Sequence, residues 1–592
     1  MTKPTNPFEY DAAPNLAPEL LVEWFIEDHN FSRFIQSSRN VLINGERGSG
    51  KSMALIYNSL RYQKLRQKIK DESFPPPHIG IYVPCNTALT HKEEYRLLPE
   101  VEQAILSEHF LAYGIGAAIA KDLTCISNDF SPEEHAQLLD EFAYLTGVTP
   151  AANLTPFDFL KRAIRDRLKT DQMRIAKGGE VEFDFETSSF YTLILPILSA
   201  LKQTALLGNA HLSLLIDDAQ DLNSHQRKVL NSWLGYRDHS VFSFKVAIAG
   251  IRHYDLRTAF GGTILEGHDY ITVDLEKPYQ NEESGFGKFA RDVVTKRLRN
   301  VGIDLTPAQF FPQSDTFLTE LRRCADQTRQ EAIESGIPQD DRKAVYDYVY
   351  KYARARYFQG RSPKANKPVY AGFDTLVHLS TGVIRHLLDP CYWMFDELQS
   401  QGNCEGQFVV SSDVQSRVIH DRSAKLWEFV RHKLETQVEG CGKSEAEKLR
   451  QLMIKLAEHF RYRLLNHKSE PCVLSFTISG YEPQFQEELE PIFRLAQKAQ
   501  LLYVRSGPAK DGGGREDFYT PNRMLWPEYS LDVHGQHGRA SLKAIDLLGA
   551  TRGKKIPEHL EKPQGNLFEN ADVLDQPISI ALVTQSNAGS AS

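Results

Sequence analysis

The stretch RNVLINGERGSGKSMALIYNSLRYQK, residues 39–64, decides how this chain folds. A short apolar run comes first, a glycine-rich turn follows it, and apolar residues at helical spacing fill the rest. The turn fits the pattern G-x-x-x-x-G-K-[ST] at every position, so its backbone N–H groups can turn inward around phosphate oxygens. The residues predicted to bind phosphate are Gly45, Glu46, Arg47, Gly48, Ser49, Gly50, Lys51 and Ser52.

The chemistry of this loop predicts ATP and Mg²⁺ as its ligands. We expect Lys51 on the β- and γ-phosphates and the Ser52 hydroxyl on Mg²⁺, and the following helix adds the positive end of its dipole. The alternative is a glycine-rich turn that precedes a helix and binds nothing. The match at every position of the pattern favours a nucleotide site.

An acidic strand supplies the carboxylate that such a metal site needs. The run HLSLLIDD, residues 211–218, is rich in aliphatic residues and ends abruptly in Asp217 and Asp218. We assign Asp217 as the second Mg²⁺ ligand, acting through water. Asp218 stands where a water-orienting glutamate often lies, but it is one methylene shorter, so we expect slow ATP turnover. A surface turn after a core strand is the alternative for this acidic pair.

Two further apolar runs complete the predicted sheet. Residues 242–250 form one strand, and Arg252 just beyond its end is either a sensor of the γ-phosphate or a solvated strand end. Residues 79–83 form another strand by their β-branched content. More than a hundred residues separate this strand from the acidic one, and they are helical in pieces, over 97–120, 156–168 and 188–206. The prediction is an α/β fold with a parallel sheet and a helical insertion at about residues 90–205.

Residues 380–388, STGVIRHLL, resemble the sensor-2 motif of AAA+ ATPases. This resemblance implies that Arg385 lies at the start of a lid helix and pairs with the γ-phosphate. Residues 271–298 resemble the segment that follows the last core strand in the origin-recognition-complex group of initiator ATPases. The order of motifs over residues 20–400 is similar to that group, whose relatives include bacterial ATPases from mobile elements and phage-defence loci.

The family implies an ATPase that switches state with its nucleotide on duplex DNA and recruits or controls an effector protein, with homo-oligomers among its assemblies. Two features depart from it. Arg252 stands where initiators usually have a small polar residue, and an arginine there resembles the signal-transducing STAND ATPases. Residues 259–270 lack the arginine finger of AAA+ rings, and Arg257 is the nearest candidate. A STAND-like switch that senses a ligand or protein without DNA therefore stays open as the alternative.

The last third of the chain predicts helices over 413–434, 444–465 and 485–500, a strand within 472–479, and a hairpin. This is the pattern of a winged helix, and the resemblance predicts one here. Its candidate DNA contacts are Arg505, Lys510 and Arg515. Three glutamates in 487–490 and an excess of only about three positive charges over residues 421–560 argue against DNA, so a protein-docking wing stays open. We read His534, His537 and Arg539 as a solvated loop and not a metal site, because no cysteine or third histidine lies near them in the sequence.

Composition limits the remaining choices. The 592 residues suffice for several domains, 41% are hydrophobic, and no window reaches the ~18 uncharged apolar residues of a membrane helix. The net charge of -8 excludes a generally basic nucleic-acid binder, and seven scattered cysteines predict a reduced, cytoplasmic protein without membrane partners. The predicted parts are an N-terminal helical segment (1–38), an ATPase core (39–280), a helical lid (281–402), a winged-helix-like α+β domain (403–550) and a flexible tail (551–592).

Overall fold

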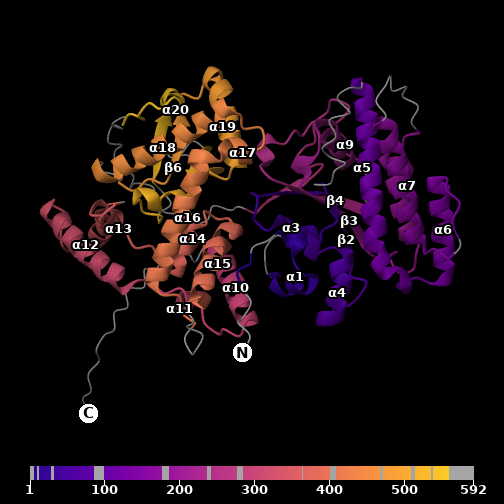
Figure 1. The fold of residues 1–592 in the computed structure, drawn as a ribbon, viewed down its shortest axis with the longest axis horizontal. Coiled ribbons are helices and arrows are strands. Elements are labelled where there is room, and N and C mark those ends of the chain that lie inside the picture. The colour runs from indigo at the N-terminus through magenta and orange to yellow at the C-terminus, as the bar shows by residue number, and fades with distance from the viewer. Residues whose placement is uncertain are drawn as a thin grey trace, which may run out of the picture.

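The computed structural model describes most of the chain. The described residues are 6–9, 12–27, 32–85, 99–151, 153–176, 186–236, 242–275, 285–362, 364–400, 408–466, 471–508, 514–534 and 538–558. Figure 1 shows two bodies side by side, one built on the nucleotide motif and one formed by the lid and the C-terminal part. The predicted domain boundaries stay predictions, and most of the predicted tail lies outside the described residues.

A five-stranded parallel sheet forms the first body, which confirms the predicted α/β fold. Its strand order is β2-β3-β4-β1-β5. The strands are β1 (Val41–Asn44), β2 (His78–Pro84), β3 (His211–Asp217), β4 (Phe242–Ile248) and β5 (Ile271–Asp274). Strands β3 and β4 are buried along almost their whole length, as continuous aliphatic runs predict for central parallel strands.

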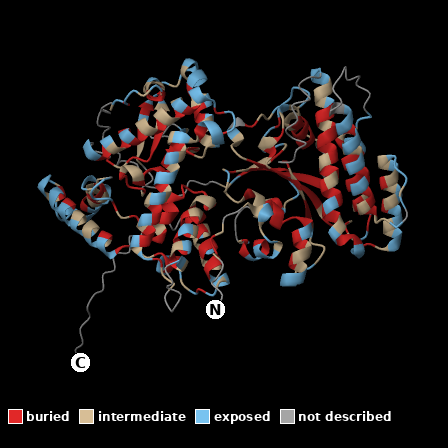
Figure 2. Ribbon diagram, viewed as in Figure 1, coloured by how far each residue is buried: buried red, intermediate tan, exposed pale blue. Residues whose placement is uncertain are grey.

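Helices cover both faces of this sheet (Figures 1 and 2). One face carries α1 (Pro18–Trp24), α3 (Lys51–Tyr57) and α4 (Leu60–Lys70), whose apolar side chains form one buried cluster. The other face carries α5 (Glu100–Leu123) and α9 (Ser224–Leu234), which belong to a second cluster. The carboxyl ends of β1 and β3 therefore emerge together at one edge of the sheet, next to the glycine-rich turn.

The predicted helical insertion extends the first body beyond strand β2 (Figure 1). Besides α5 it contains α6 (Pro132–Thr146), α7 (Pro156–Ala176) and α8 (Leu195–Lys202). In the described part of the chain, the helical stretch Glu100–Asp129 is long and apolar enough to cross a membrane. Of its most apolar 18-residue window, however, 72% is buried inside the fold. The apolar side chains of this stretch pack in the cluster that covers the sheet, so the stretch is a core helix of the fold.

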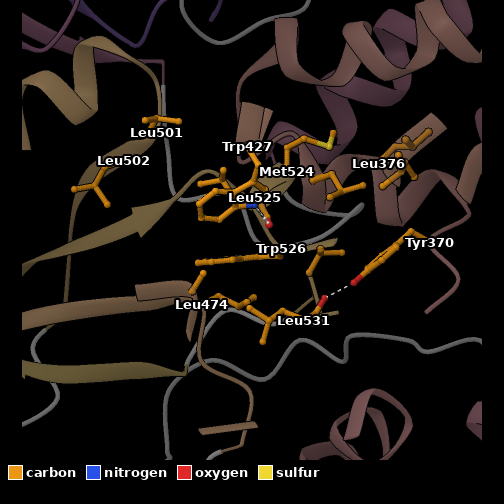
Figure 3. Close-up of a cluster of buried hydrophobic side chains, with 14 of the residues drawn as sticks. Tyr370, Leu376, Trp427, Leu474, Leu501, Leu502, Met524, Leu525, Trp526 and Leu531 are labelled. Atoms are coloured by element: carbon orange, nitrogen blue, oxygen red, sulfur yellow. Dashed lines mark hydrogen bonds between the residues drawn. The ribbon is translucent and has the colours of Figure 1, made fainter. Parts of the chain in front are cut away.

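The lid and the C-terminal part share one continuous hydrophobic core. The lid contains α10 (Gly285–Asn300), α11 (Pro307–Phe310), α12 (Asp315–Glu334), α13 (Arg342–Gln359), α14 (Phe373–Leu379) and α15 (Ile384–Ser400). In Figure 3, Trp427 Nε1 donates to the Leu525 carbonyl at 2.8 Å, and the Tyr370 hydroxyl donates to the Leu531 carbonyl at 2.7 Å. The second of these bonds joins the lid to the C-terminal part inside this core, so the two parts form one packed unit.

The C-terminal part contains the elements that the sequence predicts, plus, among its described residues, one strand and two α-helices that it does not. The predicted elements are α16 (Ser412–His432), α18 (Lys443–Asn466), β6 (Ser475–Ser479), α19 (Pro483–Lys498), β7 (Leu502–Pro508) and β8 (Arg515–Pro521). Strands β7 and β8 pair as the antiparallel hairpin. Strand β9 (Arg539–Lys543) pairs in parallel with β6, and α20 (Ala544–Thr551) follows it. The helix α17 (Leu434–Gln437) links α16 to α18.

Candidate nucleotide site

The glycine-rich loop has the backbone shape of a phosphate cradle. Gly48 and Gly50 have φ values of 86° and 100°, which favour glycine, and a Cβ on Gly45 would lie 2.7 Å from the Ser49 hydroxyl. That Ser49 hydroxyl is buried and has no hydrogen-bond partner in the described structure. Lys51 Nζ donates to the Gly45 and Glu46 carbonyls at 2.6 and 2.9 Å. An unsatisfied hydroxyl and a buried ammonium in one loop are a donor set that fits phosphate oxygens.

Asp217 lies against this loop, as predicted for a magnesium-side carboxylate. Its side chain is buried, and it accepts a hydrogen bond from the Tyr82 hydroxyl at 2.8 Å. Burial and the neighbouring Asp218 carboxylate raise the pKa of Asp217, while hydrogen bonds from Ser52 and Tyr82 oppose that rise. A buried carboxylate that is costly to ionise and touches the Ser52 hydroxyl fits a divalent cation, because the cation stabilises its charged form.

Asp218 has a left-handed backbone conformation, and its side chain is held by a hydrogen bond. Its φ is 55°, and its carboxylate accepts from Gln220 Nε2 at 3.0 Å. The other end of the Gln220 amide accepts from the Ala249 N–H at 2.9 Å, just past strand β4. Asp218 therefore lines the cavity at the ends of β3 and β4, which is where a residue that orients water has to lie.

Arg252 points away from the cavity that the other motif residues line. Its guanidinium forms an ion pair with Asp517 on the hairpin strand β8. The sequence leaves a γ-phosphate sensor and a solvated strand end open. The Arg252 side chain is exposed, as at a solvated strand end, and it also forms this ion pair. It joins the ATPase core to the C-terminal part.

The N-terminal segment closes the far end of the cavity, which has a volume of about 360 Å³. Pro14, Trp24, Phe25 and other apolar residues line that end, which suits the flat apolar face of a base. The Arg297 guanidinium lies 4.1 Å from the centre of the Trp24 ring and donates to the Pro7 and Glu9 carbonyls at 3.0 and 2.5 Å. Burial lowers the pKa of Arg297 to about 9. This arginine ties the N-terminal segment to lid helix α10.

The sensor-2 turn touches both the phosphate loop and the C-terminal part. The Arg385 N–H donates to the Gly48 carbonyl at 3.2 Å, and its side chain lines the cavity. Thr381 has a φ of 54° and is fully buried. Its hydroxyl accepts from the Arg523 N–H at 3.0 Å, and its carbonyl accepts from Arg505. The turn that carries Arg385 is thus fixed by residues from the far end of the chain.

Replacing Arg385 with alanine should separate ATP binding from ADP binding. We expect a loss of about tenfold in ATP affinity, because a charge-assisted contact with the γ-phosphate disappears, and little change for ADP, which lacks that phosphate. Titrations with fluorescent ATP and ADP analogues measure both. Arg322→Ala, exposed on α12, is the matched control. An equal loss for both nucleotides would contradict the assignment and indicate damage to the turn.

The two predicted DNA contacts that the structure describes, Arg505 and Arg515, differ in exposure. Arg505 is 8% exposed and bonded to the sensor-2 turn, so its assignment as a phosphate contact is wrong for this arrangement. Its strand position explains the error, because the side chain points from β7 toward the lid. Arg515 is exposed at the start of β8 and donates to the Ser506 carbonyl at 3.0 Å. Lys510 lies outside the described residues.

His534 is also not in a solvated loop. It lies with Asp374 and His378 in a cluster of potential metal-ligand atoms, and its Nε2 is 3.4 Å from the Asp374 carboxylate. Arg523 lies 3.1 Å from His378 Nδ1, and Arg354 lies 2.5 Å from His534 Nδ1. A metal-bound imidazole carries a proton on its other nitrogen, which an arginine cannot accept. The cluster therefore suits a charge-balanced contact between lid and C-terminal part better than a metal. Arg539 lies in β9, and His537 is outside the described residues.

Comparison with known proteins places this site in a family. Three solved structures are similar: ORC1 of Aeropyrum pernix in complex with DNA (11% identity, 88% of this chain and 95% of that one, TM-score 0.29), ORC2 of the same organism in ADPNP–ADP complexes (12%, 93% and 99%, 0.29) and Cdc6p of Pyrobaculum aerophilum (12%, 88% and 96%, 0.27). No curated protein sequence matches the chain. The family model described as ORC-CDC6-like matches residues 6–542. The chain belongs to this ORC-CDC6-like family of AAA+ ATPases.

Proposed function

We propose that this protein binds ATP with Mg²⁺, hydrolyses it slowly to ADP and phosphate, and acts as a nucleotide-dependent switch on duplex DNA. Family membership supports a DNA-associated nucleotide switch. The observation that carries the proposal is the set of contacts by which the C-terminal part reaches the nucleotide loop. Gln500 Nε2 donates to the Arg47 carbonyl at 2.6 Å, and Arg505 holds the turn that carries Arg385.

These contacts give the switch a physical route. A nucleotide in the loop would meet the residues around Arg47 and Arg385 directly. The C-terminal part bonds to the Arg47 carbonyl and, through Thr381, to the turn that carries Arg385. Any shift of the loop or of the turn on γ-phosphate binding changes those bonds and the ion pair between Arg252 and Asp517. The orientation of the C-terminal part therefore depends on whether ATP or ADP is bound.

The chemistry assigned to the site uses the chain's own side chains. The P-loop N–H groups and Lys51 bind the phosphates, Ser52 and Asp217 would hold Mg²⁺, and Asp218 orients the attacking water. Mg²⁺, when bound, neutralises charge that develops on the phosphate oxygens. Because Asp218 is shorter than glutamate and also bonded to Gln220, it holds the water less firmly. Turnover is slow for this reason.

The C-terminal part is the proposed DNA-binding module, of winged-helix type. It has two helices, a strand, a helix and an antiparallel hairpin in the order that such modules use. The first half of α19 carries Glu487, Glu488 and Glu490, which repel phosphates, so Arg515 at the start of β8 is the better phosphate contact. We expect weak binding that depends little on sequence.

Replacing Lys510 and Arg515 together with alanine tests this module. If each cation neutralises one phosphate, the slope of log K against log salt should fall in magnitude by about 1.8, with no change in sequence preference. Duplex titrations at several salt concentrations measure the slope. Arg329→Ala with Lys343→Ala removes two charges from the α12–α13 hairpin and serves as the matched control. An unchanged slope in the tip variant would remove the hairpin from the DNA interface.

The biological setting that we propose for this switch rests on its resemblance to bacterial relatives of the family. The switch would recruit or control an effector protein in a mobile-element or antiviral defence system, in the cytoplasm. The STAND-like alternative, a signalling ATPase that needs no DNA, predicts salt-insensitive or undetectable duplex binding in every nucleotide state. The duplex titrations separate the two readings.

A further inference from the structure

The magnesium-side carboxylate has a partner that none of the motifs contains. Tyr82, near the end of strand β2, lines the cavity and donates its hydroxyl hydrogen to Asp217 Oδ2 at 2.8 Å. The second carboxylate oxygen, Oδ1, accepts from the Asp218 N–H at 3.1 Å. With a donor on each oxygen and the Ser52 hydroxyl as a further donor, the plane of the Asp217 carboxylate is fixed before any cation arrives.

The Tyr82 hydroxyl is the donor of this hydrogen bond, because an ionised carboxylate can only accept. Burial and the neighbouring Asp217 charge raise the pKa of Tyr82 far above its ordinary value. The hydroxyl therefore keeps its proton, and it can only donate toward the Asp217 anion. This hydrogen bond stabilises the charged form of a carboxylate that burial otherwise disfavours.

Tyr82 is itself held by the helical insertion. Strand β2 lies at the edge of the sheet, so alternate N–H groups of its backbone face away from β3. The Tyr82 N–H donates to the Asp122 carboxylate at 2.9 Å, and Asp122 lies near the end of the long insertion helix α5. Asp122 is buried, and burial raises its pKa to about 6. A buried carboxylate that covers one edge N–H is a specific contact and not incidental packing.

We propose that Tyr82 is the positioning residue of the Mg²⁺ site, and that the helical insertion, through Asp122, sets the place of Tyr82. The inference rests on the proposed function, because it concerns the same Asp217 carboxylate and the same cation. It gives the insertion a role: a change in the position of α5 moves Tyr82 and, through its hydroxyl, changes how well Asp217 receives Mg²⁺.

Tyr82→Phe tests the first half of this proposal. The ring remains and the hydroxyl is lost, so nucleotide affinity in excess EDTA should stay at the wild-type value. The Mg²⁺ concentration that gives half of the Mg²⁺-dependent gain in nucleotide affinity should rise about tenfold. Titration of Mg²⁺ with a fluorescent ATP analogue measures this without hydrolysis. Tyr113→Phe removes a hydroxyl from a buried tyrosine of the same insertion and is the matched control.

Asp122→Ala tests the second half. Alone, it should raise the Mg²⁺ requirement in the same direction as Tyr82→Phe. In the Tyr82→Phe background it should add nothing, because its effect passes through the missing hydroxyl. Thermal unfolding and affinity in EDTA show whether each variant is folded.

The outcomes separate this inference from the proposed function. A wild-type Mg²⁺ requirement in a folded Tyr82→Phe variant would overturn the role of Tyr82 while leaving the nucleotide site intact. An Asp122→Ala effect of equal size in both backgrounds would overturn the link to the insertion. Failure of the wild-type chain to bind nucleotide at all would contradict the proposed function, and the inference would fall with it.

Discussion

Replacing Lys51 with alanine should lower ATP affinity and turnover by a factor of a hundred or more. The ammonium is the buried cation of the loop, 5% exposed, and its loss leaves phosphate charge without its main counterpart. Nucleotide titration and phosphate release under saturating Mg²⁺ measure the two quantities.

The Lys51→Ala variant needs a control for structural damage to the glycine-rich loop. Lys51 donates to two loop carbonyls, so alanine leaves these acceptors unpaired and can loosen the loop. Lys51→Met keeps the length and volume of the side chain without the charge and should lose ATP to the same extent. Lys64→Ala on α4, which breaks the ion pair between Lys64 and Asp129, is the matched control. Wild-type turnover in the Lys51→Met variant would refute the site.

Replacing Asp217 with asparagine should have the second largest effect. Mg²⁺-dependent hydrolysis should fall about a hundredfold, because the neutral amide cannot balance the charge of the cation. Nucleotide affinity in EDTA should stay close to the wild-type value, since asparagine has the same shape and its carbonyl oxygen accepts from Tyr82. Phosphate release measured against Mg²⁺ concentration checks the first result, and nucleotide titration checks the second.

The raised pKa of Asp217 adds a pH signature to this variant. In the wild type the carboxylate must lose its proton before it receives Mg²⁺, so Mg²⁺ affinity should rise with pH through that raised pKa. The Asp217→Asn variant should lack this dependence. Asp218→Asn should keep ATP and cleave it more slowly, and Asp140→Asn, exposed on α6, should match the wild type. If the Asp217→Asn variant and the Asp218→Asn variant both hydrolyse ATP at the wild-type rate, the acidic strand has been misassigned.

The nucleotide loop and the acidic strand were predictable because their chemistry is local in sequence. Lys51 and Ser52 follow their glycines directly, and Asp217 ends an aliphatic run that has only one sensible place in a parallel sheet. The same locality gave the helix before the hairpin and the hairpin itself. The α/β fold of the first body is confirmed for these reasons.

Other parts of the site depend on contacts between distant residues. Tyr82 looks like one more apolar residue in a core strand, and only the pairing of β2 with β3 brings its hydroxyl to Asp217. Arg505 looks like a wing cation, yet its strand faces the lid, 124 residues away in sequence. His534 seemed to have no third ligand nearby, because His378 joins it only through folding.

Helix α6 and strand β9 are not among the predicted elements, and they differ in the strength of their local sequence patterns. Helix α6 begins with a capping box in which Ser131 and Glu134 satisfy each other's N–H groups, and that pattern is visible in the sequence. Strand β9 is five residues long and pairs in parallel with β6, 64 residues earlier. A short strand whose partner is remote has little local signal, so packing decides it.

The central claim is that the bound nucleotide sets the orientation of the C-terminal part, which contacts the nucleotide loop through Gln500 and the Arg47 carbonyl. Duplex affinity of the wild-type chain should be measured at one salt concentration with a slowly hydrolysed ATP analogue, with ADP and without nucleotide. If the nucleotide sets the orientation of the C-terminal part, the ATP-analogue state should bind duplex about tenfold more tightly than the ADP state, and Lys51→Met should show no difference between them. Equal affinity in all three states, or no duplex binding in any of them, would contradict the account.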